Sequence, residues 1–317
     1  MIIWLAVAQP TANPYAHCKL YTWHGRRVPT EVTFNAVIAG LLTEGRLQNG
    51  SVVDAGAHEG THSCLYASLA PTRTVHAIEP LVLNVRAITR RWSHLPNLRV
   101  HHSGLGSVPR EVDLGPMGRE AMLQAEQLEA FDRTPKVRRR SGGSSFSPGG
   151  SASGGGSGTA FHIHRLDDLF ASEPLALVHL DVEGGELDVL IGATHCLTRD
   201  RPLVTTEVQM LSKARRVRQL LAFMWGHGYE SWMVDESCGY QVDCRNLLHI
   251  PRERMRTFVG SPSLDVAVAS RAVLPIGNLS TAIEYVRKHQ HTITLPRRMH
   301  RCGVRCGLGE MRARFGD

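Results

Sequence analysis

Four acidic residues each stand at the end of a short apolar run of the kind that forms a buried β-strand. They are Asp54, Glu79, Asp181 and Glu207. Because the carboxyl ends of parallel strands meet at one edge of a sheet, these carboxylates are expected to share a rim. Such a rim disfavours phosphate groups, which prefer backbone amides and cations. The four acids therefore predict a site for a cationic compound without phosphates.

A glycine turn follows the first of these strands. Residues 51–60 read SVVDAGAHEG and lead into an expected helix. Gly56 is expected to let a ligand approach the backbone, and Gly60 to allow close packing of strand and helix. His58 stands where the dinucleotide-binding pattern G-x-G-x-x-G has its middle glycine, so its side chain would meet a pyrophosphate. A nicotinamide dinucleotide is therefore a poor fit to this turn.

The second acid, Glu79, lies 25 residues after Asp54 and is followed by Pro80. In dinucleotide and nucleoside folds, an acid at the end of the second strand receives the ribose hydroxyls, about 20 residues beyond the glycine turn. We therefore expect Glu79 to bind a ribose.

The third acid begins a second motif, LDVEGGE, at residues 180–186. Asp181 and Glu183 are candidates for a general base, and His58 and His179 are weaker ones because of the ordinary pKa of histidine. The other role open to these acids is to cap the next helix, since acids are favoured in a first helical turn. That alternative applies most to Glu186.

Alternating apolar strands and amphipathic helices position these residues. Five strand–helix alternations followed by a hairpin predict an α/β fold: a doubly wound Rossmann-like sheet, mostly parallel, with a C-terminal antiparallel hairpin. In the helix after Gly185, the residues Leu187, Leu190 and Ile191 are expected to face the sheet. The strands are predicted near residues 51–54, 74–80, 98–102, 161–164, 176–180, 202–209, 229–236, 245–251 and 264–270, and the helices over 31–47, 61–69, 81–92, 212–225 and 281–289.

A low-complexity segment interrupts this alternation. Residues 138–158 read RRRSGGSSFSPGGSASGGGSG, which predicts a flexible, disordered insertion within one domain. The expected domain spans residues 31–270. It is preceded by an amino-terminal segment, 1–30, and followed by a helix and basic tail, 271–317.

The net charge of +7 and the pI near 9.2 would suit a polyanionic partner. However, the basic runs lack interleaved aromatic residues and zinc-finger spacing, so no nucleic-acid partner is expected. The apolar run Ile2–Ala8 is too short to cross a bilayer. A truncated signal sequence stays open.

Seven scattered cysteines favour a reducing compartment and a cytoplasmic location. Cys238 and Cys244 are spaced to bridge across a turn, which the sequence leaves open. The group His300, Cys302 and Cys306 lacks a fourth ligand. No metal site is therefore expected.

Several motifs together resemble the FkbM-type class I methyltransferases. They are VVDAGAHEG, HAIEP, LDDL, LDVEGGELDVLIGA and PLVTTEV, and the resemblance runs from about Ser51 to Pro251. It implies the class I methyltransferase fold, S-adenosyl-L-methionine as cofactor and methylation of hydroxyl groups. The chain departs from the family at position 58, where His58 replaces the usual Asn, and in the insertion after Arg138.

The resemblance also implies roles for individual residues, with Glu79 on the ribose, residues 103–105 beside the adenine and the methyl acceptor over Asp181. The cofactor-binding candidates are Asp54, Gly56, Ala57, Gly60, Glu79, Pro80, Ser103, Gly104 and Leu105, and the catalytic candidates are Asp181, Glu183 and His58.

These observations predict an S-adenosylmethionine-dependent methyltransferase that acts on a hydroxyl of a small molecule, sugar or lipid. Two alternatives stay open: a catalytically inactive nucleoside-binding module and an NAD-dependent oxidoreductase. Neither the acceptor nor the oligomeric state follows from the sequence.

Overall fold

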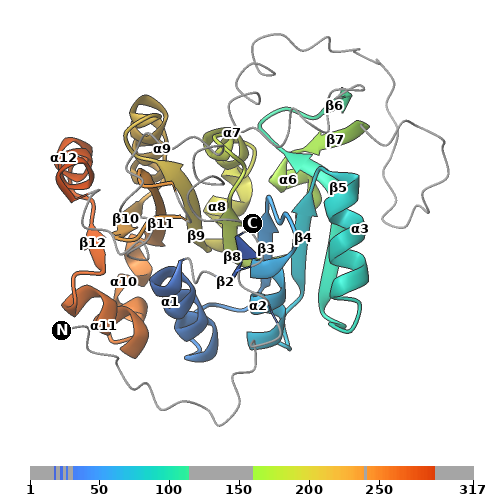
Figure 1. Cartoon of the computed structure of the whole chain (residues 1–317), viewed down its shortest axis with the longest axis horizontal. Coiled ribbons are helices and arrows are strands. Elements are labelled where there is room, and N and C mark those ends of the chain that lie inside the picture. Colours follow the sequence, from blue (N-terminus) through green and yellow to red (C-terminus); the bar gives the residue numbers. More distant parts are fainter. Residues whose placement is uncertain are drawn as a thin grey trace.

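The computed structural model of the chain describes Cys18 and residues 22–23, 26–27, 31–113, 160–238 and 241–289. Most of the expected amino-terminal segment, the Gly/Ser-rich insertion and the basic tail lie outside these residues. In the described part, a ten-stranded sheet runs through the molecule and helices cover both of its faces (Figure 1). A two-stranded antiparallel ribbon, β1 (Thr22–Trp23) and β2 (Arg26–Arg27), precedes the sheet in the chain.

The strand order of the sheet is β12-β10-β11-β9-β8-β3-β4-β5-β7-β6. The chain runs outward from β3 through β4 to β5 and later returns to β8 on the other side of β3. The five central strands are parallel, whereas β11, β10 and β12 continue the sheet in antiparallel pairs. This confirms the predicted doubly wound sheet and puts a topological switch point between β3 and β8. The strands are β3 (Ser51–Ala55), β4 (Val75–Glu79), β5 (Leu98–Leu105), β6 (Arg110–Asp113), β7 (Ala160–His164), β8 (Leu175–Leu180), β9 (Leu203–Gln209), β10 (Tyr229–Val234), β11 (Cys244–Pro251) and β12 (Val273–Pro275).

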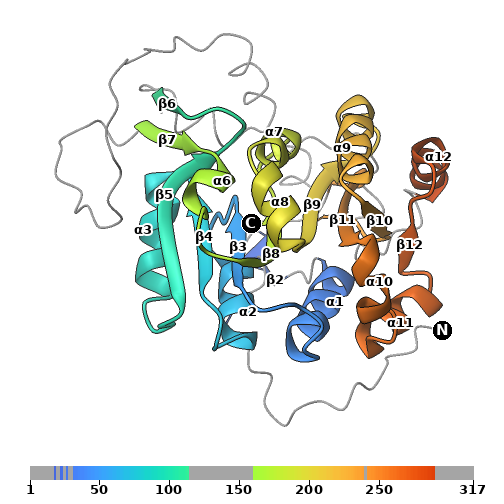
Figure 2. The ribbon, with the colours of Figure 1, turned by 180° about the vertical axis from the view of Figure 1, so that it is seen from behind.

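Two layers of helices enclose the sheet, as the views from opposite sides show (Figure 2). One face carries α1 (Val32–Thr43), α2 (Thr61–Leu69), α3 (Val82–Arg91), α10 (Met255–Phe258) and α11 (Pro262–Ala269), in apolar clusters that include Phe34, Leu65 and Ile88. The opposite face carries α6 (Leu166–Leu169), α7 (Glu186–Ile191), α8 (Thr194–Asp200), α9 (Ala214–Gly226) and α12 (Leu279–His289). None of the described helices is long and apolar enough to span a membrane.

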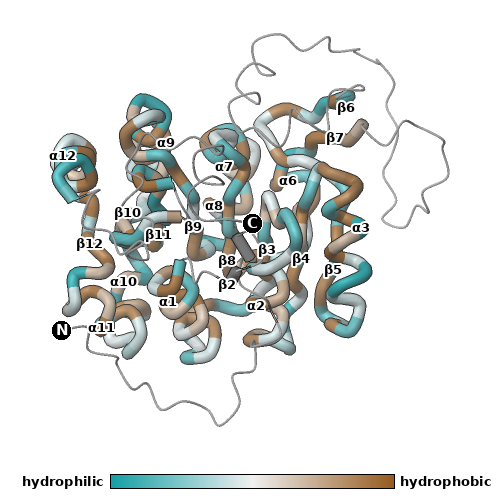
Figure 3. The backbone as a smooth tube through the Cα atoms, in the orientation of Figure 1, coloured by the Kyte–Doolittle hydropathy of each residue, from teal (hydrophilic) through white to brown (hydrophobic). Residues whose placement is uncertain are grey.

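The central strands are buried along their whole length. Every residue of β3 and of β8 is buried, and the tube in Figure 3 is largely hydrophobic there. Val52 packs in the cluster under α1 and α2, whereas Val53 packs in the cluster on the other face. A strand that is covered on both faces has a nearly continuous run of apolar residues. That run is why the sequence predicted these two strands.

The predicted edge strand at residues 264–270 is wrong, because this segment forms helix α11. The hydroxyl oxygen of Ser261 accepts a hydrogen bond from the backbone N–H of Leu264, and Pro262 occupies the first turn. These are helix-start signals, and Leu264 and Ala267 are buried three positions apart. The strand had been predicted because apolar residues alternate in this segment. The edge strand is β12, which pairs with β10.

Two predicted details of the other elements also differ. Ile191 is 43% exposed, while Val189 and Leu190 carry the buried face of α7. Strand β5 continues through Leu105, because residues 103–105 pair in parallel with β7. Residues 103–105 were not predicted as strand, because their partner segment lies more than 50 positions away and local periodicity does not reveal such pairing.

The carboxyl-terminal hairpin is antiparallel as predicted, and β11 lies between β9 and β10. Beyond residue 270, where the domain was expected to end, β12 adds to the sheet. Helix α12 then buries Leu279, Ala282 and Val286 in the main core cluster. The folded unit therefore extends to His289.

Two disulfides tie the molecule together. Cys18 is bonded to Cys64 in α2, and Cys238 is bonded to Cys244 at the start of β11. The second is the bridge that the sequence left open. Among the described cysteines, only Cys196 is free, and it is buried.

Candidate active site at the switch point

The turns after β3 and β8 contact each other directly. The backbone N–H of Asp181 donates to the carbonyl oxygen of Ala55 at 2.9 Å. Gly56 has φ +80°, and a Cβ at this position would overlap the carbonyl oxygen of Asp181. The absent side chain of Gly56 thus makes room for the neighbouring turn, and its role in admitting a ligand stays a prediction.

Glu79 lies at the end of β4, 4% exposed, and collects three hydrogen bonds. Its Oε1 accepts the backbone N–H of Leu81 at 2.8 Å and Nδ2 of Asn84 at 3.3 Å, and its Oε2 accepts the backbone N–H of His58 at 2.8 Å. Burial raises the pKa of Glu79, and these donors counteract that rise. Since a carboxylate has about four lone-pair sites, one acceptor position is left on Oε2.

His58 and the glycine turn hold this carboxylate in place. His58 has φ +49°, a left-handed conformation in which His is enriched, and its side chain is exposed. Ala57 is buried, and its carbonyl oxygen accepts the backbone N–H of Gly60 at 2.7 Å. A Cβ on Gly60 would contact Trp92 and Ile88 at 2.9–3.1 Å, so the close packing predicted for Gly60 is made with α3.

The remaining cofactor candidates lie beside this turn. Pro80 follows Glu79 directly, and its carbonyl oxygen lies 3.0 Å from Nε2 of His102. Ser103 is buried, and Gly104 lies against Phe161 of β7. These residues belong to the neighbouring strands β4 and β5, which pair along residues 75–79 and 98–102. Their contact with an adenine stays a prediction.

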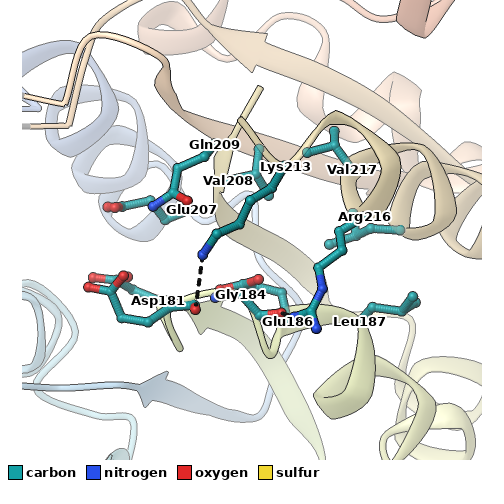
Figure 4. Close-up of a pocket in the computed structure, with 12 residues that line it drawn as sticks. Asp181, Gly184, Glu186, Leu187, Glu207, Val208, Gln209, Lys213, Arg216 and Val217 are labelled. Atoms are coloured by element: carbon teal, nitrogen blue, oxygen red, sulfur yellow. Dashed lines mark hydrogen bonds between the residues drawn. The ribbon is translucent and has the colours of Figure 1, made fainter. Parts of the chain in front are cut away.

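A pocket opens beyond the carboxyl ends of β8 and β9, and Figure 4 shows the side chains around it. Asp181 and Glu183 come from the turn after β8, and Glu207 comes from β9. Lys213 and Arg216 come from the first turns of α9 and its approach. The predicted acids 181, 183 and 207 are thus brought together, with two cations beside them.

Two acids of this pocket, Asp181 and Glu207, have strongly raised pKa values. Burial raises the pKa of Asp181 well above its usual range, and Glu183 and Glu31 raise it further. Burial raises the pKa of Glu207 in the same direction, followed by the charge of Asp181. Carboxylates that share a desolvated site cannot all ionise cheaply, so Asp181 and Glu207 titrate as a pair.

Glu186 serves the turn in addition to lining the pocket. Its Oε1 accepts the backbone N–H of Gly184 at 2.8 Å, which is the capping role considered for this residue. Burial raises the pKa of Glu186 to about 7. Nζ of Lys213 donates to the carbonyl oxygen of Glu183 at 3.4 Å, and Arg216 donates to that of Gly184 at 2.5 Å. The basic start of α9 therefore holds a turn in which Glu183 has φ +56°.

Asp54 does not lie on the rim with the other acids. It is 1% exposed, accepts a hydrogen bond from the hydroxyl of Ser63 in α2, and belongs to the α1–α2 side of the sheet. His179 is buried on the same side. The expected rim of four acids is thus a pocket with Asp181 and Glu207, a separate cradle around Glu79, and a buried Asp54.

Several residues that influence the pocket acids were not predicted from the sequence. Glu31 is the residue before α1, is buried, and accepts a hydrogen bond from Nδ2 of Asn246 at 2.6 Å. Lys213 and Arg216 belong to a basic run at residues 213–218. They lie about 30 residues after Asp181, so no local pattern links them to that acid. Their place shortly after Glu207 is the one sequence feature that could have indicated a cation beside the pocket.

The chain matches the Methyltransferase FkbM domain over residues 54–242. Among solved structures, it is similar to methyltransferase FkbM from Methylobacillus flagellatus KT, with 17% identity over 66% of this chain and 47% of that one and a TM-score of 0.42. The chain thus corresponds to about half the length of that protein.

Two further solved structures are similar to this chain. Precorrin-6y C5,15-methyltransferase from Geobacter metallireducens GS-15 has 13% identity, covers 73% of this chain and 89% of its own, and has a TM-score of 0.36. Aeropyrum pernix fibrillarin, in complex with natively bound S-adenosyl-L-methionine, has 11% identity, with 68% and 76% covered and a TM-score of 0.37. No curated protein sequence matches the chain.

Proposed function

This chain belongs to the FkbM family of S-adenosylmethionine-dependent methyltransferases, and from that membership we propose that it methylates a hydroxyl oxygen of a small molecule, sugar or lipid. The observation that carries the proposal is the acidic pocket beside the switch point. In open α/β sheets, ligands bind in the crevice at this point. The pocket lies within the matched residues 54–242.

The acids of the pocket supply what transfer to a hydroxyl needs. A hydroxyl must lose its proton as its oxygen is methylated, and a carboxylate with a raised pKa is a better base near neutral pH than an ordinary one. Asp181 has such a pKa and follows the strand next to the glycine turn. We assign it the role of base, with Glu183 as the neighbouring candidate. His58 holds Glu79 instead, through its backbone N–H.

The cradle around Glu79 fits the nucleoside part of the cofactor. Its remaining acceptor position on Oε2 suits a ribose hydroxyl, and residues 103–105 flank it on β5. When bound, the cofactor supplies a methyl group on a positively charged sulfur. The carboxyl groups of the pocket suit that cation. The protein's main task is to hold the acceptor oxygen in line with the methyl carbon.

The two alternatives differ from this proposal in what they bind and release. An inactive nucleoside-binding module would bind S-adenosylmethionine without turnover, and an oxidoreductase would prefer a nicotinamide dinucleotide. Both are disfavoured by the pocket acids: the first has no use for a buried base, and the second would place a pyrophosphate near carboxylates.

The test combines calorimetry with a labelled-methyl assay on the full chain. We expect S-adenosylmethionine to bind, NAD to bind at least about tenfold more weakly, and label to appear in hydroxyl-containing extracts of small molecules, glycans or lipids. Absence of S-adenosylmethionine binding would reject the cofactor. Binding without label transfer to any extract, by wild type and Asp181→Asn alike, would favour the inactive module.

The two disulfides bear on where the protein acts. Disulfides persist in oxidising compartments and are rare in the cytoplasm. The bonds Cys18–Cys64 and Cys238–Cys244 therefore favour an oxidising compartment over the cytoplasmic location expected from the scattered cysteines. Thiol labelling of protein from its native source checks this: only a fully labelled Cys64 and Cys244 would restore the cytoplasmic expectation.

A further inference from the structure

A second group of chemistry-bearing side chains lies on the α1–α2 side of the sheet. Asp54 from β3, His62 from α2 and His179 from β8 each bring one potential metal-ligand atom within 4.8 Å of the other two. Asp54 and His179 are each 1% exposed and His62 is 9% exposed. Two imidazoles and one carboxylate are the donor set that many proteins use for Zn²⁺ and related divalent transition metals.

His179 is held as metal-ligating histidines usually are. Its Nδ1 lies 2.7 Å from the hydroxyl oxygen of Thr205, which fixes the ring. Among the described residues, its buried Nε2 has no hydrogen-bond partner. The imidazole tautomer with its proton on Nδ1 leaves a lone pair on Nε2. A buried acceptor without a donor indicates that something else occupies that direction.

A buried carboxylate lies beside this cluster, on the residue that precedes α1. Oε2 of Glu31 lies 3.9 Å from Nε2 of His62, while Oε1 of Glu31 accepts a hydrogen bond from Asn246. Glu31 therefore orients His62 from outside the set of three ligands.

Two buried carboxylates lie in this region, those of Asp54 and Glu31. The pocket acids add to the negative field, since Asp54 and Glu31 both raise the pKa of Asp181. Buried carboxylates are usually paired or bound to a metal, because an isolated buried charge is costly. A dication near Asp54 and Glu31 would neutralise both.

We propose that Asp54, His62 and His179 bind one divalent transition-metal ion of the Zn²⁺ class. The ion joins α2, β3 and β8. This proposal does not depend on methyl transfer. It differs from the expectation of no metal site, which rested on cysteines and histidines that are close in sequence.

A second candidate cluster, Glu207 with Cys238 and Cys244, is not the site proposed. Its ligand atoms lie equally close together, but the two sulfurs are joined in a disulfide and are not available as thiolates. Metal binding must therefore be measured without reductant, and the two clusters must be separated by variants.

The experiment uses the full chain, stripped of metal by chelator and titrated with Zn²⁺ in non-reducing buffer. We expect one equivalent to bind. Replacement of Zn²⁺ by Co²⁺ should give visible d–d bands without a thiolate charge-transfer band, because the ligands are nitrogen and oxygen. Binding of no metal by the wild type, or a thiolate band in its Co²⁺ spectrum, would overturn the proposal.

Variants assign the ligands. His62→Gln should weaken Zn²⁺ binding by more than about 100-fold, and Thr205→Val, which removes only the partner of His179, by about 10-fold. His162→Gln on the exposed side of β7 is the matched control and should bind as the wild type does. The Cys238→Ser/Cys244→Ser pair should also retain its metal. Unchanged affinity in both His62→Gln and Thr205→Val would contradict the assignment, even if a further variant, His179→Gln, fails to fold.

Discussion

The two halves of the sheet on either side of the switch point use their strand-end acids in opposite ways. On the β4 side, Glu79 is surrounded by three N–H donors that hold one carboxylate in one orientation. On the β8–β9 side, Asp181 and Glu207 share a pocket where burial and the charges of neighbouring carboxylates raise both pKa values. Donors make a carboxylate a binding group, whereas like charges make it a proton acceptor near neutral pH.

The difference arises from the turns and not from the strands. Glu79 is followed by Pro80 and faces the glycine turn, so backbone N–H groups of residues 58 and 81 are free of strand pairing and point at it. Asp181 is followed by a turn whose N–H of Gly184 is already taken by Glu186. Acids near the carboxyl ends of neighbouring strands are therefore held by N–H donors in one half and placed beside other acids in the other.

The largest expected effect is on turnover. Asp181→Asn should lower kcat by roughly 10³-fold, because a positioned base contributes about 10²–10⁴ to such reactions. The dissociation constant of S-adenosylmethionine should stay within about twofold. Labelled-methyl kinetics with the acceptor and calorimetry with the cofactor measure the two quantities. Asp188→Asn, on α7 outside the pocket lining, is the control; equal loss in both variants would mean that the β8 half has no base.

The second-largest effect is expected at the contact between the turns after β3 and β8, where Gly56 meets Asp181. Gly56→Ala places a Cβ on the carbonyl of Asp181 and forces alanine to φ +80°. We expect a loss of roughly 3 kcal/mol in the free energy of unfolding, from strain and overpacking together. Gly45→Ala has a similar φ of +67° but nothing within 4 Å, so it isolates the strain. Urea unfolding measures both, and equal losses would show that the contact between the turns contributes nothing.

The raised pKa of Glu186 predicts how stability depends on pH. The unfolded state releases this proton near 4.5, and the folded state near 7. Between these values the folded state binds more protons, so the free energy of unfolding falls as pH rises, by on the order of 2–3 kcal/mol. Asp181 and Glu207 act in the same direction. Urea unfolding between about pH 5 and pH 8 measures the slope.

Glu186→Gln keeps an acceptor for Gly184 and should flatten that slope, while Glu59→Gln, an exposed change, should not. A variant that keeps the full wild-type slope would show that the acids of the β8–β9 half are not the groups that titrate.

The smallest expected effect is on cofactor affinity. In Glu79→Gln an NH₂ group replaces one oxygen and confronts a backbone N–H, so S-adenosylmethionine should bind about tenfold more weakly with kcat at saturation unchanged. Calorimetry and saturation kinetics separate the two. Glu59→Gln, in the same turn but paired with Arg91, is the control. A fall in kcat with no change in affinity would reverse the roles assigned to the two halves.

Much of the fold could be predicted because its central elements are local in character. Strands β3, β4, β8 and β9 are apolar runs closed by an acid or a glycine turn. Helix α11 could not be recognised from alternation, since Leu-Asp-Val-Ala-Val-Ala fits both periods and only the cap at Ser261 distinguishes them. The pairing of β5 residues 103–105 with β7 likewise crosses the whole insertion.

For the candidate site, the sequence was informative about residue types and poor about directions. It identified Glu79 and Asp181 from their places at strand ends. It placed Asp54 on the rim with them, yet that side chain points to α2 and bonds Ser63. Successive side chains of a strand point to opposite faces of the sheet. An error of one residue in the predicted end of a strand therefore reverses the side to which its last side chain points.

What the sequence by itself determined was the set of local elements: acid-ended strands, glycine turns with left-handed φ, and the amphipathic helices between them. Only the tertiary structure decided that β8 lies beside β3, that Gly56 meets Asp181, and that Asp54, His62 and His179 come together. The physical reason is that residues far apart in the chain become neighbours through strand order. Sheet pairing and the burial of both faces set that order, and no local pattern records it.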